Sequence, residues 1–276
     1  MKVSEILAKS VLVKSNLPAS DYVANAYTGC PHKCRYCYAS FMKRFTGHEE
    51  EWGTFIDVKS YESMKLPKNL AGKTVLLSSV TDPYNPYEAK YRKSREILGL
   101  LSGTGAHIEI LSKSDLILRD LDLLKKIPDL SVGISLNTLD DGFRRDMEPC
   151  APSVERRLNA LEALHTEGIR TYTFISPIFP HITDIHAIME RVLPHSDMIC
   201  FEDLNLRGKA KAGILQYISE TYPQYTETYQ KIYQKKDRSY WQALEEEIHT
   251  LAAGSDIPLV SYFNHSKIKK GGKTHD

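Results

Sequence analysis

The sequence predicts an α/β fold, a partial (β/α)6 TIM-like barrel with a C-terminal helical extension. Short apolar segments rich in β-branched residues alternate with longer segments whose apolar residues recur every three or four positions. This alternation is typical of repeated βα units around a mainly parallel sheet. The predicted strands are Tyr22–Tyr27, Thr74–Ser79, His107–Leu111, Ser131–Leu136, Thr171–Ser176 and Met198–Glu202. The predicted helices are Tyr91–Leu101, Leu116–Lys126, Val154–Glu167 and Ile185–Leu193, the last with Asp184 as its N-cap.

Length and a change of pattern after Arg207 predict the domain organisation. A chain of 276 residues with 42% hydrophobic content can bury one sizeable core, and α/β barrels of about 250 residues commonly form a single domain. We therefore expect one domain over residues 1–276, with a barrel core at about 20–207. The remainder, about 208–276, contains a Tyr- and Lys-rich helical region, Gly213–Ala253, and a short apolar run, Leu259–Phe263.

Composition restricts the partners and the compartment. The 36 basic and 35 acidic residues give a formal net charge of +1, so there is no global electrostatic argument for binding nucleic acid or membrane. No apolar run approaches the roughly 20 residues that span a bilayer, and the first residues lack the apolar core of a secretory signal. We expect no membrane partner and a cytoplasmic location. Five cysteines, three of them within eight residues, favour a metal or cluster over a disulfide framework.

The segment NAYTGCPHKCRYCYA carries the strongest chemical signal. It places Cys30, Cys34 and Cys37 in a C-x3-C-x2-C spacing directly after a predicted strand, at the end of the barrel where catalytic loops gather. Three thiolates can bind three irons of a [4Fe–4S] cubane and leave the fourth iron without a protein ligand. One alternative is a structural zinc site with His32 or His48 as fourth ligand. Another is a ferredoxin-like electron carrier, although its fourth thiolate is missing nearby.

With these cysteines, the chain resembles the radical S-adenosylmethionine (SAM) superfamily. That resemblance implies that SAM binds the open iron and, on reduction, releases a 5′-deoxyadenosyl radical that abstracts hydrogen from the substrate. The segments SSVTDPYNPYE, LSKSDLILRDLDLL and TFISPIFP are similar to the branch of spore photoproduct lyase and DNA-repair photolyase-like proteins. FMKRFTGHEEEWG and FEDLNLRG resemble radical SAM mobile pair protein B. The implied partners are a flavodoxin- or ferredoxin-type electron donor and a second radical SAM protein.

The resemblance to spore photoproduct lyase also implies SAM-binding residues. The lyase uses a serine after its second strand, a lysine after its third and a serine after its fourth, which match Ser79, Lys113 and Ser135. A lysine ammonium can pair with the SAM carboxylate, and hydroxyls can bond the carboxylate or the ribose. The alternatives are a solvated loop lysine and ordinary capping of the strand ends by the serines.

Three further residues are candidates for the cofactor site. Asp82 and Asn137 follow the same strand ends and are predicted to reach the ribose hydroxyls or the substrate. Asp82 has an alternative role in an Asx-turn before Pro83. Tyr36, between the second and third cysteines, is predicted to pack on the adenine.

One departure from the lyase concerns its hydrogen donor. The lyase quenches its product radical with a cysteine two residues before the SAM-binding serine, and that place is Leu77 here. This difference argues against spore photoproduct as the substrate. Cys150 and Cys200 remain candidate hydrogen donors or extra ligands. Burial by packing is the favoured alternative for both, because free cysteines are among the most buried residue types.

Polar and aromatic residues near the end of the barrel suggest how a substrate is held. Glu202, Asn205 and Arg207 follow the sixth strand, and an arginine can grip a carboxylate or phosphate bidentately. A salt-bridged rim is the alternative.

Aromatic residues also recur at helical spacing in the extension. They suit either a stacking platform for single-stranded nucleic acid or a buried seam, and we favour the seam. They are Tyr222, Tyr225, Tyr229 and Tyr233.

These observations predict a radical SAM enzyme, of lyase or transferase type, that abstracts hydrogen from an organic substrate. Nucleic-acid repair or modification is the first substrate hypothesis, and it depends on the family resemblance. Radical modification of a peptide, a protein or a small metabolite is the alternative. A non-enzymatic iron–sulfur or zinc protein that acts by interaction is a further one.

Overall fold

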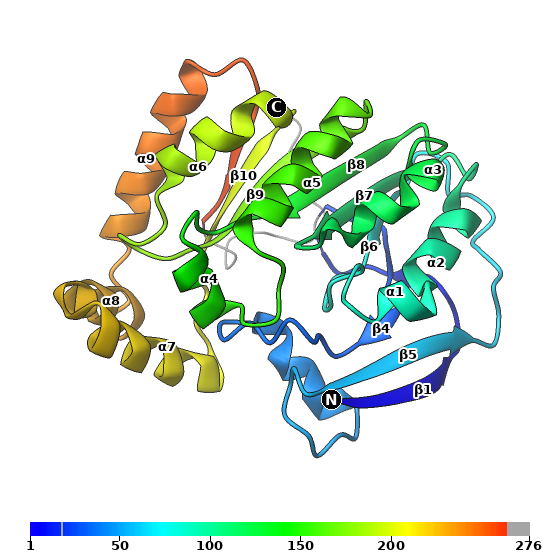
Figure 1. Cartoon of the computed structure of the whole chain (residues 1–276), viewed down its shortest axis with the longest axis horizontal. Coiled ribbons are helices and arrows are strands. Elements are labelled where there is room, and N and C mark those ends of the chain that lie inside the picture. Colours follow the sequence, from blue (N-terminus) through cyan, green and yellow to red (C-terminus); the bar gives the residue numbers. More distant parts are fainter. Residues whose placement is uncertain (18, 264–276) are drawn as a thin grey trace.

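The computed structural model describes residues 1–17 and 19–263, and its main sheet is an open, mostly parallel one (Figure 1). Within the described residues the strand order is β11-β10-β9-β8-β7-β6-β3-β2. The six parallel core strands are β3 (Tyr22–Ala24), β6 (Thr74–Leu77), β7 (His107–Ser112), β8 (Leu130–Ser135), β9 (Arg170–Ile178) and β10 (Ile199–Asp203). They match the six predicted strands, and the fold class, a partial barrel, is confirmed.

The two edge strands of this sheet, β2 and β11, do not pair with each other, so the barrel stays open. β2 (Val13–Lys14) pairs antiparallel with β3, and β11 (Leu259–Tyr262) pairs parallel with β10. β8 is buried along its whole length, whereas β6 and β7 alternate buried and half-buried residues. Helices cover one face of the sheet, and the other face lines the interior of the partial barrel.

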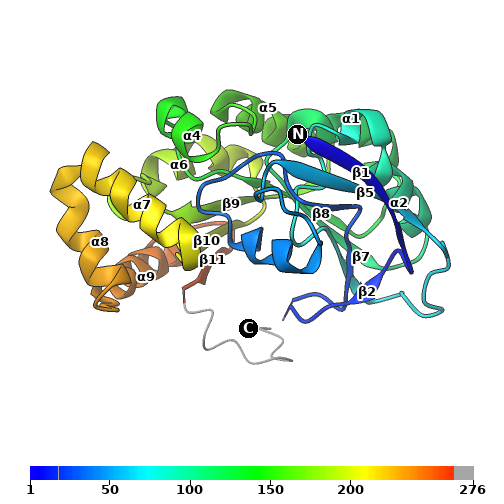
Figure 2. The ribbon, with the colours of Figure 1, turned by 90° about the horizontal axis from the view of Figure 1, so that it is seen from below.

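Helices cover one face of the sheet in the order that the periodicity predicts (Figures 1 and 2). α2 (Lys93–Leu101), α5 (Val154–Thr166) and α6 (Ile185–Val192) fall on predicted helices. The predicted N-cap of α6 is confirmed, since Asp184 accepts a hydrogen bond from the Ala187 N–H at 3.0 Å. The predicted helix Leu116–Lys126 is instead a 3-10 helix, η2 (Asp115–Asp120), followed by α3 (Leu121–Leu124). Two helices were not predicted, α1 (Glu88–Tyr91) and α4 (Asp141–Met147), and a 3-10 turn, η3 (Leu193–His195), follows α6.

The C-terminal extension lies beyond the β10 edge of the sheet (Figures 1 and 2). Its predicted helical region is divided into α7 (Gly208–Thr221), η4 (Pro223–Tyr225), α8 (Thr226–Tyr233) and α9 (Ser239–Ala253). A proline follows α7, and proline lacks the N–H that would continue a helix. The four tyrosines of this region pack against the core, with Tyr229 fully buried, which supports the seam over an open platform. Residues 264–276 of the predicted extension lie outside the described part.

A second, smaller sheet was not predicted. Its strands are β1 (Lys2–Ala8), β5 (Phe55–Tyr61) and β4 (Tyr27–Thr28), in the order β1-β5-β4. The cysteine loop leaves this sheet at β4 and enters η1 (Tyr38–Phe45). Within residues 1–17 and 19–263, no helix combines the length and the apolar character needed to cross a bilayer.

Gly29 lets the cysteine loop pass close to the small sheet. Its φ is +86°, and a Cβ built there would lie 2.4 Å from the backbone oxygen of Phe55. A larger residue would be strained in this left-handed backbone conformation, and its Cβ would clash with Phe55.

We predict that Gly29→Ala lowers the free energy of unfolding by about 1–3 kcal/mol and reduces iron incorporation, because it displaces the loop before Cys30. Gly47→Ala is the matched control, since Gly47 also has a positive φ (+71°) but no atom within 4 Å of its built Cβ. Denaturant unfolding and iron analysis check this prediction. Equal losses in both variants would mean that the close contact with Phe55 is unimportant.

Candidate functional site

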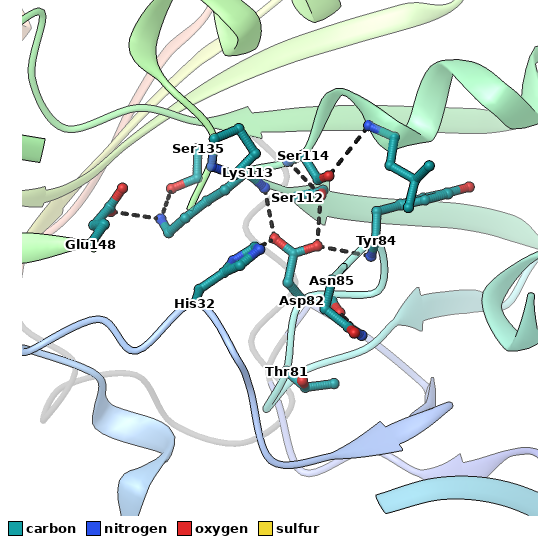
Figure 3. Close-up of polar contacts among 12 residues, drawn as sticks. His32, Thr81, Asp82, Tyr84, Asn85, Ser112, Lys113, Ser114, Ser135 and Glu148 are labelled. Carbon is teal, nitrogen blue, oxygen red and sulfur yellow. Dashed lines mark hydrogen bonds and ion pairs between the residues drawn. The ribbon is translucent and has the colours of Figure 1, made fainter. Parts of the chain in front are cut away.

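Four loops meet at the carboxyl ends of the barrel strands and bring the predicted residues together. They are the cysteine loop between β4 and η1 and the loops after β6, β7 and β8. Figure 3 shows the side chains of His32, Asp82, Lys113, Ser135 and Glu148 gathered from these loops and from the end of α4. All five cysteines of the chain are free, and Cys30, Cys34 and Cys37 are half-buried.

The three cysteine thiols lie close enough to influence one another. Burial, followed by the neighbouring Cys37, raises the pKa of Cys30 to about 12. Burial and the Glu148 carboxylate raise the pKa of Cys34 well above its ordinary value, and the other two cysteines add to the effect. Three thiolates at this place therefore require a positive charge among them, which iron supplies.

The two histidines considered as the fourth ligand of a zinc site differ in their contacts. His48 uses both ring nitrogens elsewhere, at 2.8 Å from Asp57 Oδ1 and 3.0 Å from Glu50 Oε2. Nε2 of His32 has no partner among the described residues. In a cubane each thiolate binds its own iron, so the three cysteines need no histidine to hold it.

Lys113 and Ser135 meet, as the sequence predicts. The ammonium of Lys113 donates a hydrogen bond to Ser135 Oγ at 2.6 Å and lies 3.3 Å from Glu148 Oε1. The side chain of Lys113 is only 16% exposed. A solvated loop lysine, the alternative considered for this residue, does not describe this environment.

Asp82 organises the loops instead of pointing freely into the site. Its Oδ1 accepts hydrogen bonds from the Tyr84 N–H at 2.8 Å and from Ser112 Oγ at 2.7 Å. Its Oδ2 accepts from the Lys113 N–H at 2.8 Å and lies 3.5 Å from His32 Nδ1. The bond from Tyr84, two residues later, is the Asx-turn considered as the alternative. Asp82 thus connects the loop after β6 to the loop after β7.

Glu148 is a site residue that the sequence analysis missed. This fully buried carboxylate accepts a hydrogen bond from the Tyr36 hydroxyl and pairs with the fully buried Arg157. Although burial works to raise it, Arg157 and Lys113 hold the pKa of Glu148 at about 2. A signal was present, because Arg157 occupies the apolar face of α5 with Val154, Leu158 and Leu161, where an arginine needs a buried partner.

Asn137 and His32 are among the described residues with buried side-chain atoms that have no hydrogen-bond partner. The side-chain amide of Asn137, a residue only 1% exposed, has none, and neither has Nε2 of His32. Buried polar groups without hydrogen bonds are costly. A ligand that carries amine, carboxylate and hydroxyl groups would satisfy them.

The remaining cofactor candidates are placed as follows. The Ser79 N–H donates to Asn25 Oδ1 at 2.9 Å, and its carbonyl accepts from the Tyr38 hydroxyl. The Tyr36 ring packs edge-on against Phe179, with 5.7 Å between ring centroids. The predicted contact of Tyr36 with adenine stays a prediction.

The two cysteines outside the motif differ. Cys200 is buried in β10, and burial raises its pKa to about 12, which agrees with packing. Cys150 is exposed, and its N–H donates to the His32 carbonyl at 3.2 Å. Packing was therefore the wrong interpretation for Cys150, which lies on the surface beside the cysteine loop.

The predicted substrate cluster is only partly assembled. Arg207 Nε donates to Asn205 Oδ1 at 3.0 Å. Glu202 instead accepts a hydrogen bond from the hydroxyl of Ser176, at the end of the neighbouring strand β9.

The comparisons with known proteins agree with this fold. The sequence model of the radical SAM superfamily matches residues 25–192, and the chain belongs to that superfamily. An uncharacterized protein of Methanocaldococcus jannaschii is 36% identical over 252 residues, 91% of this chain and 93% of that protein. The radical SAM Nα-GlyT isomerase of Pseudomonas phage M6 is 27% identical over 168 residues, 59% of this chain and 35% of that protein. Spore photoproduct lyase, solved with dinucleoside spore photoproduct, has a TM-score of 0.67 at 14% identity, covering 95% of this chain and 82% of the lyase.

Membership makes this chain an enzyme whose cofactors are a [4Fe–4S] cluster and SAM, and such enzymes need an electron donor. The residues present fit both groups. Three thiols that influence one another suit the cluster. Beside them, the Lys113 ammonium and the buried groups of Asn137 and His32 suit an amino-acid ligand.

We predict that Cys34→Ala abolishes assembly of the cubane, because two thiolates remain for a cluster that needs three. Cys200→Ala is the control, since that thiol is buried in β10 and should leave the cluster intact. Iron and sulfide analysis with visible absorption after anaerobic reconstitution checks this. A full cubane in the Cys34 variant would contradict the ligand set.

Proposed function

We propose that Cys30, Cys34 and Cys37 hold the cluster and that Lys113 orients SAM for reductive cleavage and hydrogen abstraction from an organic substrate. The observation that carries the proposal is the Lys113 ammonium, which is held 2.6 Å from Ser135 Oγ and is largely buried among the loops that meet the cysteines. When bound, the two cofactors supply a radical able to remove hydrogen from an unactivated C–H bond.

The chain's own residues would bind SAM and orient it. The Lys113 ammonium takes the methionine carboxylate of SAM in a charge-assisted hydrogen bond. Ser79 and Ser135 offer hydroxyls to the carboxylate or the ribose, and Asn137 offers an amide that lacks a protein partner. The Asp82 carboxylate holds Lys113 in place by accepting a hydrogen bond from the Lys113 backbone N–H.

The direct test is anaerobic reconstitution of the full chain. We expect about four irons per chain and 5′-deoxyadenosine that forms only when SAM and a strong reductant are both present. Mass spectrometry of the nucleoside and iron analysis are the readouts. A folded protein that assembles no cluster and releases no 5′-deoxyadenosine would reject the proposal.

For the substrate, we favour a single-stranded nucleic acid, bound at the η1 face, which consists of Phe41, Lys43, Arg44 and Phe45. Phe41 is 47% and Phe45 is 66% exposed, and the Arg44 guanidinium lies 5.5 Å and 4.6 Å from their ring centroids. The face begins four residues after Cys37, and residues 29–48 contain four Lys or Arg and no Asp or Glu.

Exposed aromatics interleaved with basic residues are typical of surfaces that stack single-stranded bases. Two similar proteins support a nucleic-acid substrate by what their names state. One is named an Nα-GlyT isomerase, and the other is a lyase solved with a dinucleoside photoproduct. The missing thiol at Leu77, which is buried in the core, favours a reaction other than spore photoproduct reversal. Nucleic-acid repair or modification is therefore the activity that we propose.

We predict that the reconstituted enzyme binds a fluorescent single-stranded oligonucleotide with an affinity that falls as salt rises. The Phe41→Ala/Phe45→Ala variant should lose at least about tenfold in affinity. Leu193→Ala is the control, because this exposed leucine lies in η3, which precedes β10 and so belongs to the other end of the strands. Fluorescence anisotropy provides the measurement.

Absence of oligonucleotide binding at low salt would overturn the substrate proposal and leave the radical chemistry standing. A peptide, a protein or a small metabolite would then be the substrate to test. The proposed electron donor is a flavodoxin or ferredoxin, and a second radical SAM protein is proposed as a partner on the mobile-pair resemblance. Five free cysteines support a reducing cytoplasm as the setting.

A further inference from the structure

Glu148 connects three parts of the site through one buried carboxylate. The Tyr36 hydroxyl, from the cysteine loop, donates to Oε1. The Lys113 ammonium, from the loop after β7, lies 3.3 Å from the same oxygen. Arg157, from α5, pairs with Oε2 and donates to the Ser135 carbonyl at the end of β8 at 3.2 Å. A movement of the cysteine loop, of the loop after β7 or of α5 would therefore change the contacts that the other two make with Glu148.

The two cations that share Glu148 are not equivalent. Arg157 is fully buried, and its guanidinium is also fixed by the carbonyl oxygens of Pro152 and Ser135 at 3.0 Å and 3.2 Å. Lys113 is partly exposed and lies farther from the carboxylate. Arg157 therefore anchors Glu148, and Lys113 is the cation that can also reach an incoming anion.

The charges around Glu148 also favour an anion next to Lys113. Glu148 is one carboxylate shared by two cations, and Asp82, the other carboxylate of these loops, contacts the backbone N–H of Lys113 and not its ammonium. Buried charges are costly unless they are paired. A ligand carboxylate next to Lys113 would complete the balance, while Glu148 keeps the ammonium from turning towards solvent.

We propose that Glu148 is a positioning residue, which holds the Lys113 ammonium and, through Tyr36, the cysteine loop at the separation that SAM has to bridge. This inference rests on the proposed role of Lys113. SAM would bind the iron through its amine and carboxylate while the carboxylate also pairs with Lys113, so its affinity would depend on that separation. Residues that orient the ligands of a metal commonly change metal affinity or activity by about 10–100-fold when they are replaced, and we expect an effect of that order on SAM affinity.

The test is the SAM affinity of the reconstituted holoenzyme with its cluster oxidised, so that SAM is bound but not cleaved. Glu148→Gln should weaken SAM binding by about 10–100-fold. Lys113→Ala should also weaken it, and the loss in the double variant should be smaller than the product of the two single losses, because part of the effect of Glu148 passes through Lys113. Equilibrium dialysis under anaerobic conditions gives the four dissociation constants.

The fold offers a matched control in a second buried triad of the same composition. Glu88 is fully buried, accepts a hydrogen bond from the Tyr27 hydroxyl and lies 2.7 Å from Arg119 Nη2. Glu88→Gln weakens the contact with Arg119, which is half-buried and also pairs with Asp120, and among the described residues Glu88 contacts neither Lys113 nor Ser135. It should reduce stability and leave SAM affinity unchanged.

Tyr36→Phe covers the case in which Glu148→Gln does not fold. It removes one hydroxyl and keeps the Glu148–Arg157 pair, and it should weaken SAM binding severalfold and alter the EPR spectrum of the reduced cluster with SAM. Unchanged affinity and an unchanged spectrum would overturn the inference.

Other outcomes separate the inference from the proposed function. Wild-type affinity in Glu148→Gln, or losses that multiply in the double variant, would also overturn the positioning role. Equal loss of SAM affinity in Glu148→Gln and Glu88→Gln would mean that Glu148 affects SAM binding only through the stability of the fold. Normal SAM binding by Lys113→Ala would instead reject the proposed function of the site.

Discussion

Parallel pairing of six strands is the constraint on which the rest of the structure depends. Because β3, β6, β7, β8, β9 and β10 run in the same direction, their following loops emerge at one end of the sheet. Residues more than 100 positions apart, such as Tyr36 and Glu148, then come into hydrogen-bonding contact. The open sheet leaves this end accessible, and the cysteine loop crosses it from the small sheet at β4 to η1.

Burial gives the polar contacts at this end their strength. In a medium of low dielectric, the Glu148–Arg157 pair and the neighbouring Lys113 interact more strongly than they would in water. The pKa of Glu148 is lowered although the carboxylate is fully buried, because Arg157 and Lys113, together with the hydrogen bonds from Tyr36 and Arg157, oppose the effect of burial. The same burial makes three thiolates unfavourable until a metal cluster neutralises them. These properties support the proposal that a cluster binds at the thiols and that an anionic group binds next to Lys113.

The sequence predicts the barrel well and the polar network poorly, for physical reasons. Buried parallel strands are apolar along their length, so local patterns suffice to find all six. β1 and β5 were missed because β1 is exposed on one face and only half-buried on the other, and its partner begins nearly fifty residues later. Lys113 and Ser135 were found by resemblance, whereas Glu148 requires knowledge of which loop reaches Arg157. The exposed position of Cys150 likewise depends on tertiary packing, which its residue type does not reveal.

The central claim is that one iron of the cluster has no protein ligand and is left for the methionine group of SAM. Electron–nuclear double resonance of the reduced enzyme tests it directly, with SAM labelled by 15N at the amine and 17O at the carboxylate. The account predicts hyperfine coupling from both labels to the cluster. Absence of coupling in enzyme saturated with SAM, or a histidine nitrogen that stays coordinated when SAM is added, would contradict it.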